Sequence, residues 1–425
     1  MLRKLMYKLR GDFALVLIAN LFSYLITFCG SIIYVRLLGK TEFGLYTFAF
    51  GIVSLFLLVN GFGAASGVLQ YVSRAKSDDE KLAYLHFAFK SGVIFNFFIG
   101  VLIIGYALIM PLPIANARPI LLGMALFPVG RLYIDIFQAY LRATQQNKLQ
   151  AHFLIVNNCV LLTANVLGVV VFKLYGLVYF TYVGYVLMFI ISAIKFKLPV
   201  MFAKQKKPVP ISRRSFISYS FFSTMSNAFS GLLFVLDTII ISYVVKNPQL
   251  LATYRVATII PFAINFIPNI VINYYYPEFA KNAHSVTKIR QLARFVSRRM
   301  FIFSASVSLI LIICAKPLIT FIFGHNYSDS VLPFQVISFG YWIIATFRTI
   351  NGNILAALGQ AKLSFYLTFI ILIVNVAVTY VLVIKYSING AATAVVIMYA
   401  FSSLVGYITL KIILHNIENK HGQIL

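Results

Sequence analysis

The chain has 425 residues, of which 61% are hydrophobic and only 11% are charged, and its mean hydropathy is +0.90. Soluble domains contain about 45–50% apolar and about 25% charged residues, so this composition excludes a water-soluble fold and predicts a chain that lies in lipid. The formal net charge of +26 could indicate a nucleic-acid partner, but no soluble domain is present to carry a basic face, and we expect no such partner.

The first ten residues are basic and are expected to lie along the inner membrane surface. Apolar stretches then follow, each long enough to cross about 30 Å of hydrocarbon as a helix. They predict an all-α integral membrane protein with twelve transmembrane helices. The predicted spans are 13–38, 44–70, 84–110, 117–141, 151–173 and 176–198, and then 216–245, 250–276, 300–323, 331–356, 363–386 and 388–412.

A polar stretch at residues 195–214 divides these spans into two sets of six. It contains seven Lys and Arg residues, no acid and three prolines, which exclude a continuous helix. We therefore predict an N-terminal six-helix lobe at residues 1–203, a cytoplasmic linker at 204–214 and a C-terminal six-helix lobe at 215–425.

The distribution of positive charge predicts the orientation of the chain. The loops on the side of the N-terminus carry 25 of the 36 Lys and Arg residues, whereas the opposite loops carry 7 and the spans carry 4. Cytoplasmic loops are enriched in Lys and Arg, so both termini are expected to be cytoplasmic.

The two halves share loop residues at constant offsets, which indicates an internal repeat. Each half contains an even number of spans, so both enter the membrane in the same sense, as parallel repeats around a central cavity. The paired residues are Gln146 and Gln360, Lys148 and Lys362, and Gly176 and Gly390 at an offset of 214, with Asn20 and Asn227, and Ser23 and Ser230, at an offset of 207.

Several motifs occur along the chain, some in the first half and others in the second. They are RLLGKTEFGLY at 36–46, NGFGAASG at 60–67, Asp237 within LLFVLDTIII, Tyr254 with Ala257, Pro277, FGHNY at 323–327 and AALGQAK at 356–362. In these residues the chain resembles the bacterial polysaccharide flippases of the multidrug/oligosaccharidyl-lipid/polysaccharide exporter superfamily, and most of all the O-antigen-repeat (Wzx-type) flippases. It departs from their pattern at 252–254, where AlaThrTyr replaces Gly-x-Tyr.

The resemblance implies a function as well as a fold. Such a protein moves an undecaprenyl-pyrophosphate-linked oligosaccharide from the cytoplasmic to the periplasmic leaflet of the bacterial inner membrane by alternating access. It serves the synthesis of O-antigen, and hence of lipopolysaccharide, or of capsule. A polysaccharide polymerase and a chain-length regulator are the implied partners, besides the glycan lipid and the bilayer.

Cations inside the spans are the candidate ligands for the pyrophosphate, because a charge in the membrane core is costly and faces protein or water. Arg131 and Arg348 are the deepest, at about 12–15 Å from the cytoplasmic end of their helices. Arg131 shares one helical face with Asp135, Gln138 and Arg142, so an internal Arg131–Asp135 pair that serves packing alone is the alternative. Lys90 and Arg255 are shallower and could instead extend to the interface; they complete the predicted substrate-binding set.

Asp135 and Asp237 are the only acids in the spans, so they are the candidates for a coupling ion. Arg36 and Glu42 lie in the motif at the outer end of the first span and are candidates for gating, with a surface role as the alternative. Polar side chains on the first and eighth spans and on the seventh are expected to line the cavity, with interhelical hydrogen bonding as the alternative. These residues are Asn20, Tyr24, Asn227, Ser230, Asn265 and Asn269.

Other chemistry finds no support in the sequence. No Walker A motif occurs, and the Gly-rich run at 61–67 has the wrong spacing for a nucleotide site; Gly63 and Gly67 instead predict a close helix contact. The six histidines do not cluster, so we expect no metal and no cofactor. No acidic catalytic pair is apparent, and we expect no enzyme.

Two alternatives remain. A multidrug antiporter of the same fold would need carboxylates for organic cations, whereas four cations against two acids in the spans favour an anionic substrate. A membrane-embedded enzyme acting on a glycan lipid would need an acidic pair near a long outer loop, and the outer loops are short.

Overall fold

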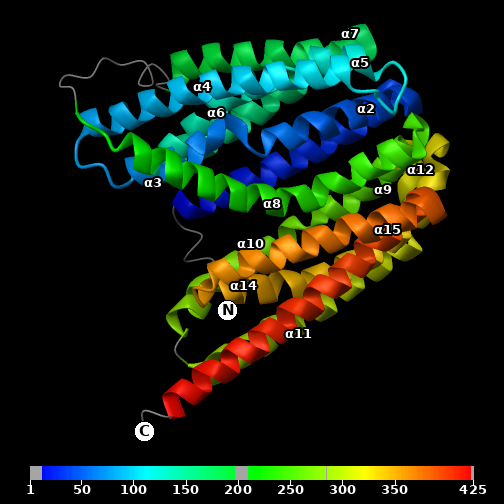
Figure 1. Ribbon diagram of the computed structural model, residues 1–425. Coiled ribbons are helices and arrows are strands. Elements are labelled where there is room, and N and C mark those ends of the chain that lie inside the picture. Colours follow the sequence, from blue (N-terminus) through cyan, green and yellow to red (C-terminus); the bar gives the residue numbers. More distant parts are fainter. Residues whose placement is uncertain (1–11, 197–208, 284, 423–425) are drawn as a thin grey trace. The chain divides into compact units, whose positions relative to one another are not determined.

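The structure is a computed structural model that describes residues 12–196, 209–283 and 285–422. In these ranges every regular element is helical (Figure 1). The basic segment expected at residues 1–10 and residues 204–208 of the predicted linker lie outside the described residues.

Nine helical stretches of the described chain are long and apolar enough to cross a membrane. Three of them, Leu15–Val72, Asn147–Lys195 and Leu363–Glu418, contain 58, 49 and 56 residues, whereas one crossing needs about 20. Each of the three has non-helical backbone at or beside the boundary between two predicted spans: at Gly39, at Phe172 and Lys173, and at Ser387. Each therefore accounts for two spans, which confirms the predicted membrane fold.

The chain divides into two compact units, Met1–Val235 and Leu236–Leu425. In the first unit α2 packs along α7, and α6 packs against α3, α4 and α7. Its elements are α2 (Asp12–Leu57), η1 (Asn60–Gly63), α3 (Ala64–Val72), α4 (Asp78–Ile109), α5 (Ala117–Gly123), α6 (Phe127–Ala143), α7 (Asn147–Lys195) and the first part of α8 (Arg213–Val245).

This division falls inside α8 rather than at the predicted linker, because the first part of α8 packs into the first unit. Phe216 is buried there against Tyr71 and Tyr84. A side chain on Gly63 or Gly67 would collide with α8, at Ser220 and its neighbours. The predicted close helix contact at Gly63 and Gly67 is thus confirmed, and α8 is the helix that makes it.

In the second unit α13 packs against α9, α11 and α15. An apolar core in this unit includes buried residues of α10, α11, α13, α14 and α15. Its elements are the rest of α8, α9 (Pro248–Ile264), α10 (Phe266–Lys281), α11 (Val286–Ile313), α12 (Ala315–Phe323), η3 (His325–Ser330), α13 (Val331–Ile343), the π-helical η4 (Ile344–Arg348), α14 (Thr349–Ala357) and α15 (Ala361–Gly422).

Backbone geometry repeats between the two units. Residues with positive φ occur in pairs at offsets of 207, 208 and 214, regardless of residue type. The pairs are Gly39 and Lys246, Asn116 and Gly324, Gln145 and Gly359, and Lys173 and Ser387. The helix ends at Gln145 and Gly359 also share a hydrogen-bond pattern. Gln146 N donates to Leu141 O at 2.9 Å, and Gln360 N donates to Leu355 O at 3.1 Å. The predicted repeat therefore extends to the conformation of single residues.

Some predicted boundaries were wrong. The span expected at 44–70 is interrupted at Asn60–Gly63, and the one at 300–323 is interrupted at Cys314. The loop expected at 277–299 is mostly helical, because α10 runs to Lys281 and α11 starts at Val286. Hydropathy marks the hydrocarbon zone, whereas the basic ends of these helices continue beyond it.

Candidate functional site

The interruption at Asn60–Gly63 is the main difference between the two repeats. Gly61, Phe62 and Gly63 all have positive φ, at 56°, 52° and 77°, and no positive-φ run in the described part of the second unit matches them. The second unit is also broken near the corresponding offset, between α9 and α10, but at the single residue Asn265, whose φ is −61°. A broken helix leaves backbone groups without helical partners, so side chains must supply the missing hydrogen bonds.

Asn96 of α4 supplies these bonds from a fully buried position. Its Oδ1 accepts from Gly61 N at 2.7 Å. Its Nδ2 donates to Asn60 Oδ1 at 2.7 Å and to Pro128 O, at the start of α6, at 2.6 Å. One amide thereby ties the broken helix to α4 and α6, and the break is a fixed part of the unit.

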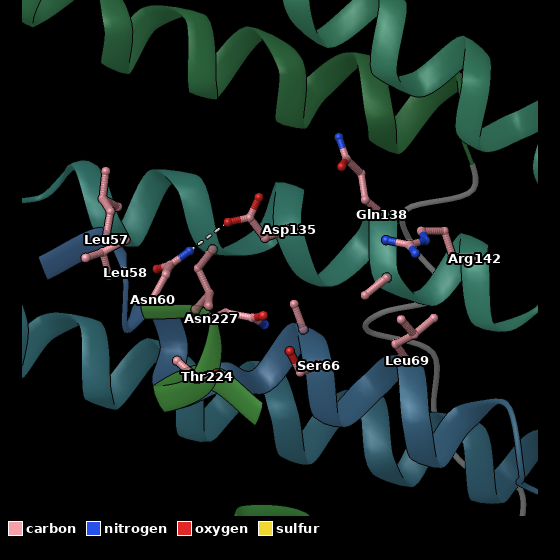
Figure 2. A pocket seen from close by; sticks show the side chains of 14 residues that line it. Leu57, Leu58, Asn60, Ser66, Leu69, Asp135, Gln138, Arg142, Thr224 and Asn227 are labelled. Atoms are coloured by element: carbon pink, nitrogen blue, oxygen red, sulfur yellow. Dashed lines mark hydrogen bonds between the residues drawn. The ribbon is translucent and has the colours of Figure 1, made fainter. Parts of the chain in front are cut away.

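The break also positions Asp135, as Figure 2 shows. Asn60 Nδ2 donates to Asp135 Oδ2 at 2.8 Å, and Arg131 Nε donates to Asp135 Oδ1 at 3.0 Å. The predicted Arg131–Asp135 pair is therefore present, but it involves only Nε of the guanidinium. The Arg131 side chain remains 51% exposed, so it is only partly occupied by this pair.

A cavity of about 320 Å³ opens beside this pair (Figure 2). Asp135, Gln138 and Arg142 of α6 face it, as the predicted helical face requires. Thr224 and Asn227 of α8 face it from the other side. The lining thus offers donors, acceptors and one cation, which suits a hydroxyl-rich polar ligand better than an apolar one.

Asp237, in the second unit, is 5% exposed and has no ion pair among the described residues. Tyr254 donates its hydroxyl to Asp237 Oδ2 at 3.3 Å, while Asp237 Oδ1 has no hydrogen-bond partner. Thr379 of α15 lies against the same carboxylate, and its Oγ1 and the Oδ1 of Asn375, one turn earlier, are also buried without partners. Two buried acceptor oxygens without a donor, Asp237 Oδ1 and Asn375 Oδ1, beside the Thr379 hydroxyl form an environment that favours a cation or a proton.

Arg348 lies in the same unit, at the end of the π-helical turn η4. Its guanidinium carbon is 5.9 Å from the centre of the Tyr399 ring, and it forms no ion pair in the described part of the chain. Tyr399 is within electrostatic reach of both Arg348 and Asp237. The predicted deep cation thus lies beside Tyr399, and Tyr399 also interacts electrostatically with the predicted coupling acid.

The other predicted charged residues are more scattered. Lys90 is exposed on α4, and Arg255 is half-buried on α9. Arg36 is exposed and Glu42 half-buried on either side of the Gly39 break. The structure does not bring Lys90 into the cavity beside Asp135, so its substrate role stays a prediction, as does that of Arg255.

The six polar residues that were predicted to line the cavity lie in different surroundings. Asn227 lines the 320 Å³ cavity, whereas Ser230 is exposed on the same helix. Asn20 and Tyr24 are exposed on α2, and Asn20 Nδ2 donates to Val16 O at 2.7 Å. The last two residues, Asn265 and Asn269, bind each other. Asn269 Nδ2 donates to Asn265 O at 2.9 Å across the break between α9 and α10.

Sequence reasoning missed the residues that organise both sites. Asn60 and Asn96 were not selected, although each is a single amide within an apolar run. Asn375 and Thr379, spaced i and i+4 on α15, were missed as well. An isolated amide or hydroxyl pair in a span is the signal that could have identified them.

A family model described as "Polysaccharide biosynthesis protein" matches residues 9–283. No curated protein shows significant similarity to the chain.

Several solved structures share the fold. An inward-facing multidrug resistance MATE family transporter of the MOP superfamily has a TM-score of 0.76 and 12% identity, over 93% of this chain and 96% of that one. The lipid II flippase MurJ in an inward closed conformation has a TM-score of 0.76 and 16% identity, over 94% and 87%. An outward-facing MATE transporter has a TM-score of 0.64 and 14% identity, over 97% and 98%. At these identities the likeness shows the fold alone.

Proposed function

Because the chain belongs to the polysaccharide biosynthesis protein family, we propose that it is a flippase for an undecaprenyl-pyrophosphate-linked oligosaccharide. It carries this lipid from the cytoplasmic to the periplasmic leaflet of the bacterial inner membrane by alternating access, with both termini cytoplasmic. The product serves O-antigen, lipopolysaccharide or capsule synthesis, together with a polymerase and a chain-length regulator. A solved flippase with the same fold, MurJ, takes lipid II according to its description.

Arg348 is the observation that carries this proposal. A guanidinium within a span that has no ion pair among the described residues needs a counter-charge, and a passing pyrophosphate supplies one. Arginine holds phosphate oxygens through two parallel hydrogen bonds, which lysine cannot do. Organic cations would be repelled at this position, so the charge favours a glycan lipid over a multidrug substrate.

In the first unit, Arg131 and the cavity beside Asp135 complete the proposed substrate path. Arg131 has guanidinium nitrogens beyond the one that binds Asp135. Gln138, Arg142 and Asn227 offer hydrogen bonds to sugar hydroxyls. Thus Arg131 and Arg348 serve the phosphates, and the cavity serves the glycan.

Coupling belongs to the second unit in this proposal. Asp237, Thr379 and Asn375 offer buried oxygens for a monovalent cation or a proton. Tyr399 lies within reach of the charges of both Asp237 and Arg348. Occupancy of Asp237 therefore changes the field at Arg348, which links the ion to the anionic substrate.

The test is translocation of a fluorescent undecaprenyl-pyrophosphate oligosaccharide in reconstituted vesicles. Arg348→Ala and Arg131→Ala are expected to lower the rate at least tenfold, because each removes charge-assisted phosphate contacts, while the Lys variants retain part of it. Arg118→Ala changes an exposed arginine and serves as the control. Wild-type rates for folded Arg348→Ala would contradict the proposal.

A further inference from the structure

A second and larger cavity lies within the second unit, away from Asp237 and its partners. It measures about 840 Å³, and its walls are α11, the segment from the end of α13 to α14, and the second half of α15. Its size lies in the range of pockets that hold a ligand of a few tens of atoms. No residue of the transport proposal lines it.

The cavity has a cationic end and an apolar end. Arg290, Arg294 and Lys411 belong to its lining, which includes no acid. On α15 the chain passes from Leu404 to Lys411 over seven residues, so the cation lies about 10 Å further along the helix. The apolar wall includes Phe347, which is 40% exposed, and Leu404, which is 58% exposed.

The three cations differ in how far they are already paired. Arg290 forms a bidentate ion pair with Glu418, at 2.7 and 2.9 Å. Arg294 and Lys411 form no ion pair among the described residues and are exposed. The mouth of the cavity therefore carries the charges of Arg294 and Lys411 without an acidic partner among the described residues. Beside them, Arg290 is held by its ion pair with Glu418.

The direction of the helices places this mouth at one membrane surface. Arg290 and Arg294 lie in the first turns of α11, and Lys411 lies toward the end of α15, on the side where the charge distribution predicts the cytoplasm. The cytoplasmic leaflet carries anionic lipids, and basic pockets between membrane helices on this side bind their headgroups. A cationic mouth at the interface and an apolar interior match one diacyl lipid with a negative headgroup.

We propose that this cavity is a binding site for an anionic phospholipid of the cytoplasmic leaflet, with its phosphate at Arg294 and Lys411 and an acyl chain along Phe347 and Leu404. A transported lipid needs cations at mid-depth, where Arg348 lies, whereas these cations lie at the helix ends. The occupant is therefore a resident lipid rather than the cargo. Phe347 and Arg348 are adjacent in the π-helical turn η4, so the bound lipid touches the element that carries the proposed substrate arginine.

The test uses the purified full-length protein and native mass spectrometry with defined lipids. Phosphatidylglycerol is expected to bind at least tenfold more tightly than phosphatidylcholine. The double variant Arg294→Ala with Lys411→Ala should remove most of that preference, because each cation near the surface contributes to the attraction of an anionic headgroup. The control double variant Lys288→Ala with Arg298→Ala removes equal charge from exposed positions of α11 that do not line the cavity.

A second arm tests the apolar part of the site. Leu404→Gln should weaken phosphatidylglycerol binding severalfold, and inorganic phosphate should not compete at millimolar concentration, since it lacks the acyl chain. Equal loss in both double variants would show a non-specific charge effect and overturn the proposal. Displacement of phosphatidylglycerol by undecaprenyl phosphate would assign the cavity to the cargo and also overturn it. Transport by the Arg348 variants is measured separately, so failure here leaves the flippase proposal intact.

Discussion

At the scale of single residues, Asp237 is the charged side chain whose surroundings favour a bound cation or a proton. Its Oδ1 is buried without a partner, and Tyr254 donates only one hydrogen bond, at 3.3 Å. An isolated buried carboxylate is unfavourable in its charged form, so it is neutralised by a cation or by a proton. Uptake of one of these, rather than hydrogen bonding alone, is therefore the expected function of the cluster.

We predict that Asp237→Asn removes the dependence of transport on an ion gradient but leaves binding of the glycan lipid within about twofold of wild type. The amide keeps the shape of the carboxylate and loses the charge that attracts the cation. Transport is measured in vesicles with and without imposed sodium and proton gradients. The control is Asp329→Asn, an exposed acid of η3. Unchanged gradient dependence in the Asp237 variant would leave that residue a packing role only.

At the scale of elements, the sharp turns inside α7 and α15 define two helix pairs. Lys173 and Ser387 hold φ of 52° and 53° with ψ of −131° and −135°, a region that strongly favours glycine. Gly176 and Gly390 follow three residues later, and a side chain there would meet the backbone of the preceding helix at Gly168 O and Leu382 O. Each turn therefore has a strained backbone at Lys173 or Ser387 and a close helix contact at the glycine three residues later.

Two substitutions in the second turn should therefore act in opposite directions. Ser387→Gly is expected to stabilise the protein by about 1 kcal/mol, because it relieves the backbone strain. Gly390→Ala is expected to destabilise it by about 1–3 kcal/mol, because the added methyl group collides with backbone. Thermal unfolding in detergent compares them, with Gly352→Ala, which has open space, as the control for packing. A lower melting temperature for Ser387→Gly would contradict the strain assigned to this turn.

At the scale of the whole molecule, the orientation can be tested directly. We predict that a cysteine at Ser212 is labelled only from the cytoplasm and one at Asp329 only from the periplasm. The reason is that Lys and Arg are concentrated on the loops that lie on the same side as the N-terminus. The native Cys29, Cys159 and Cys314 are replaced first, since all are free and two are exposed. Labelling of the Ser212 position by a membrane-impermeant reagent added to intact cells would reverse the topology.

The sequence predicts the large features of this molecule because they depend on hydropathy and charge. The breaks at Gly39 and Ser387 fall between predicted spans, and the break at Lys173 falls at the last residue of one. The helical face of Asp135, Gln138 and Arg142 faces a cavity as expected. The discontinuity at Asn60–Gly63 could not be predicted in this way, because its cause is a tertiary contact. Asn96 stabilises the discontinuity from another helix, and residue spacing along the chain does not show that Asn96 lies next to Asn60 and Gly61.

The matched positive-φ residues have a consequence for the history of the chain. Gly39 corresponds to Lys246 and Asn116 to Gly324, so the backbone conformation has outlasted the residue that first permitted it. Such inheritance is the mark of a gene duplication followed by divergence of side chains. The break at Asn265 is the counterpart of the interruption that contains Gly61–Gly63, but it consists of one residue with a φ of −61°. The two copies have therefore diverged in backbone conformation within their second helix, where the paralogous halves are no longer interchangeable.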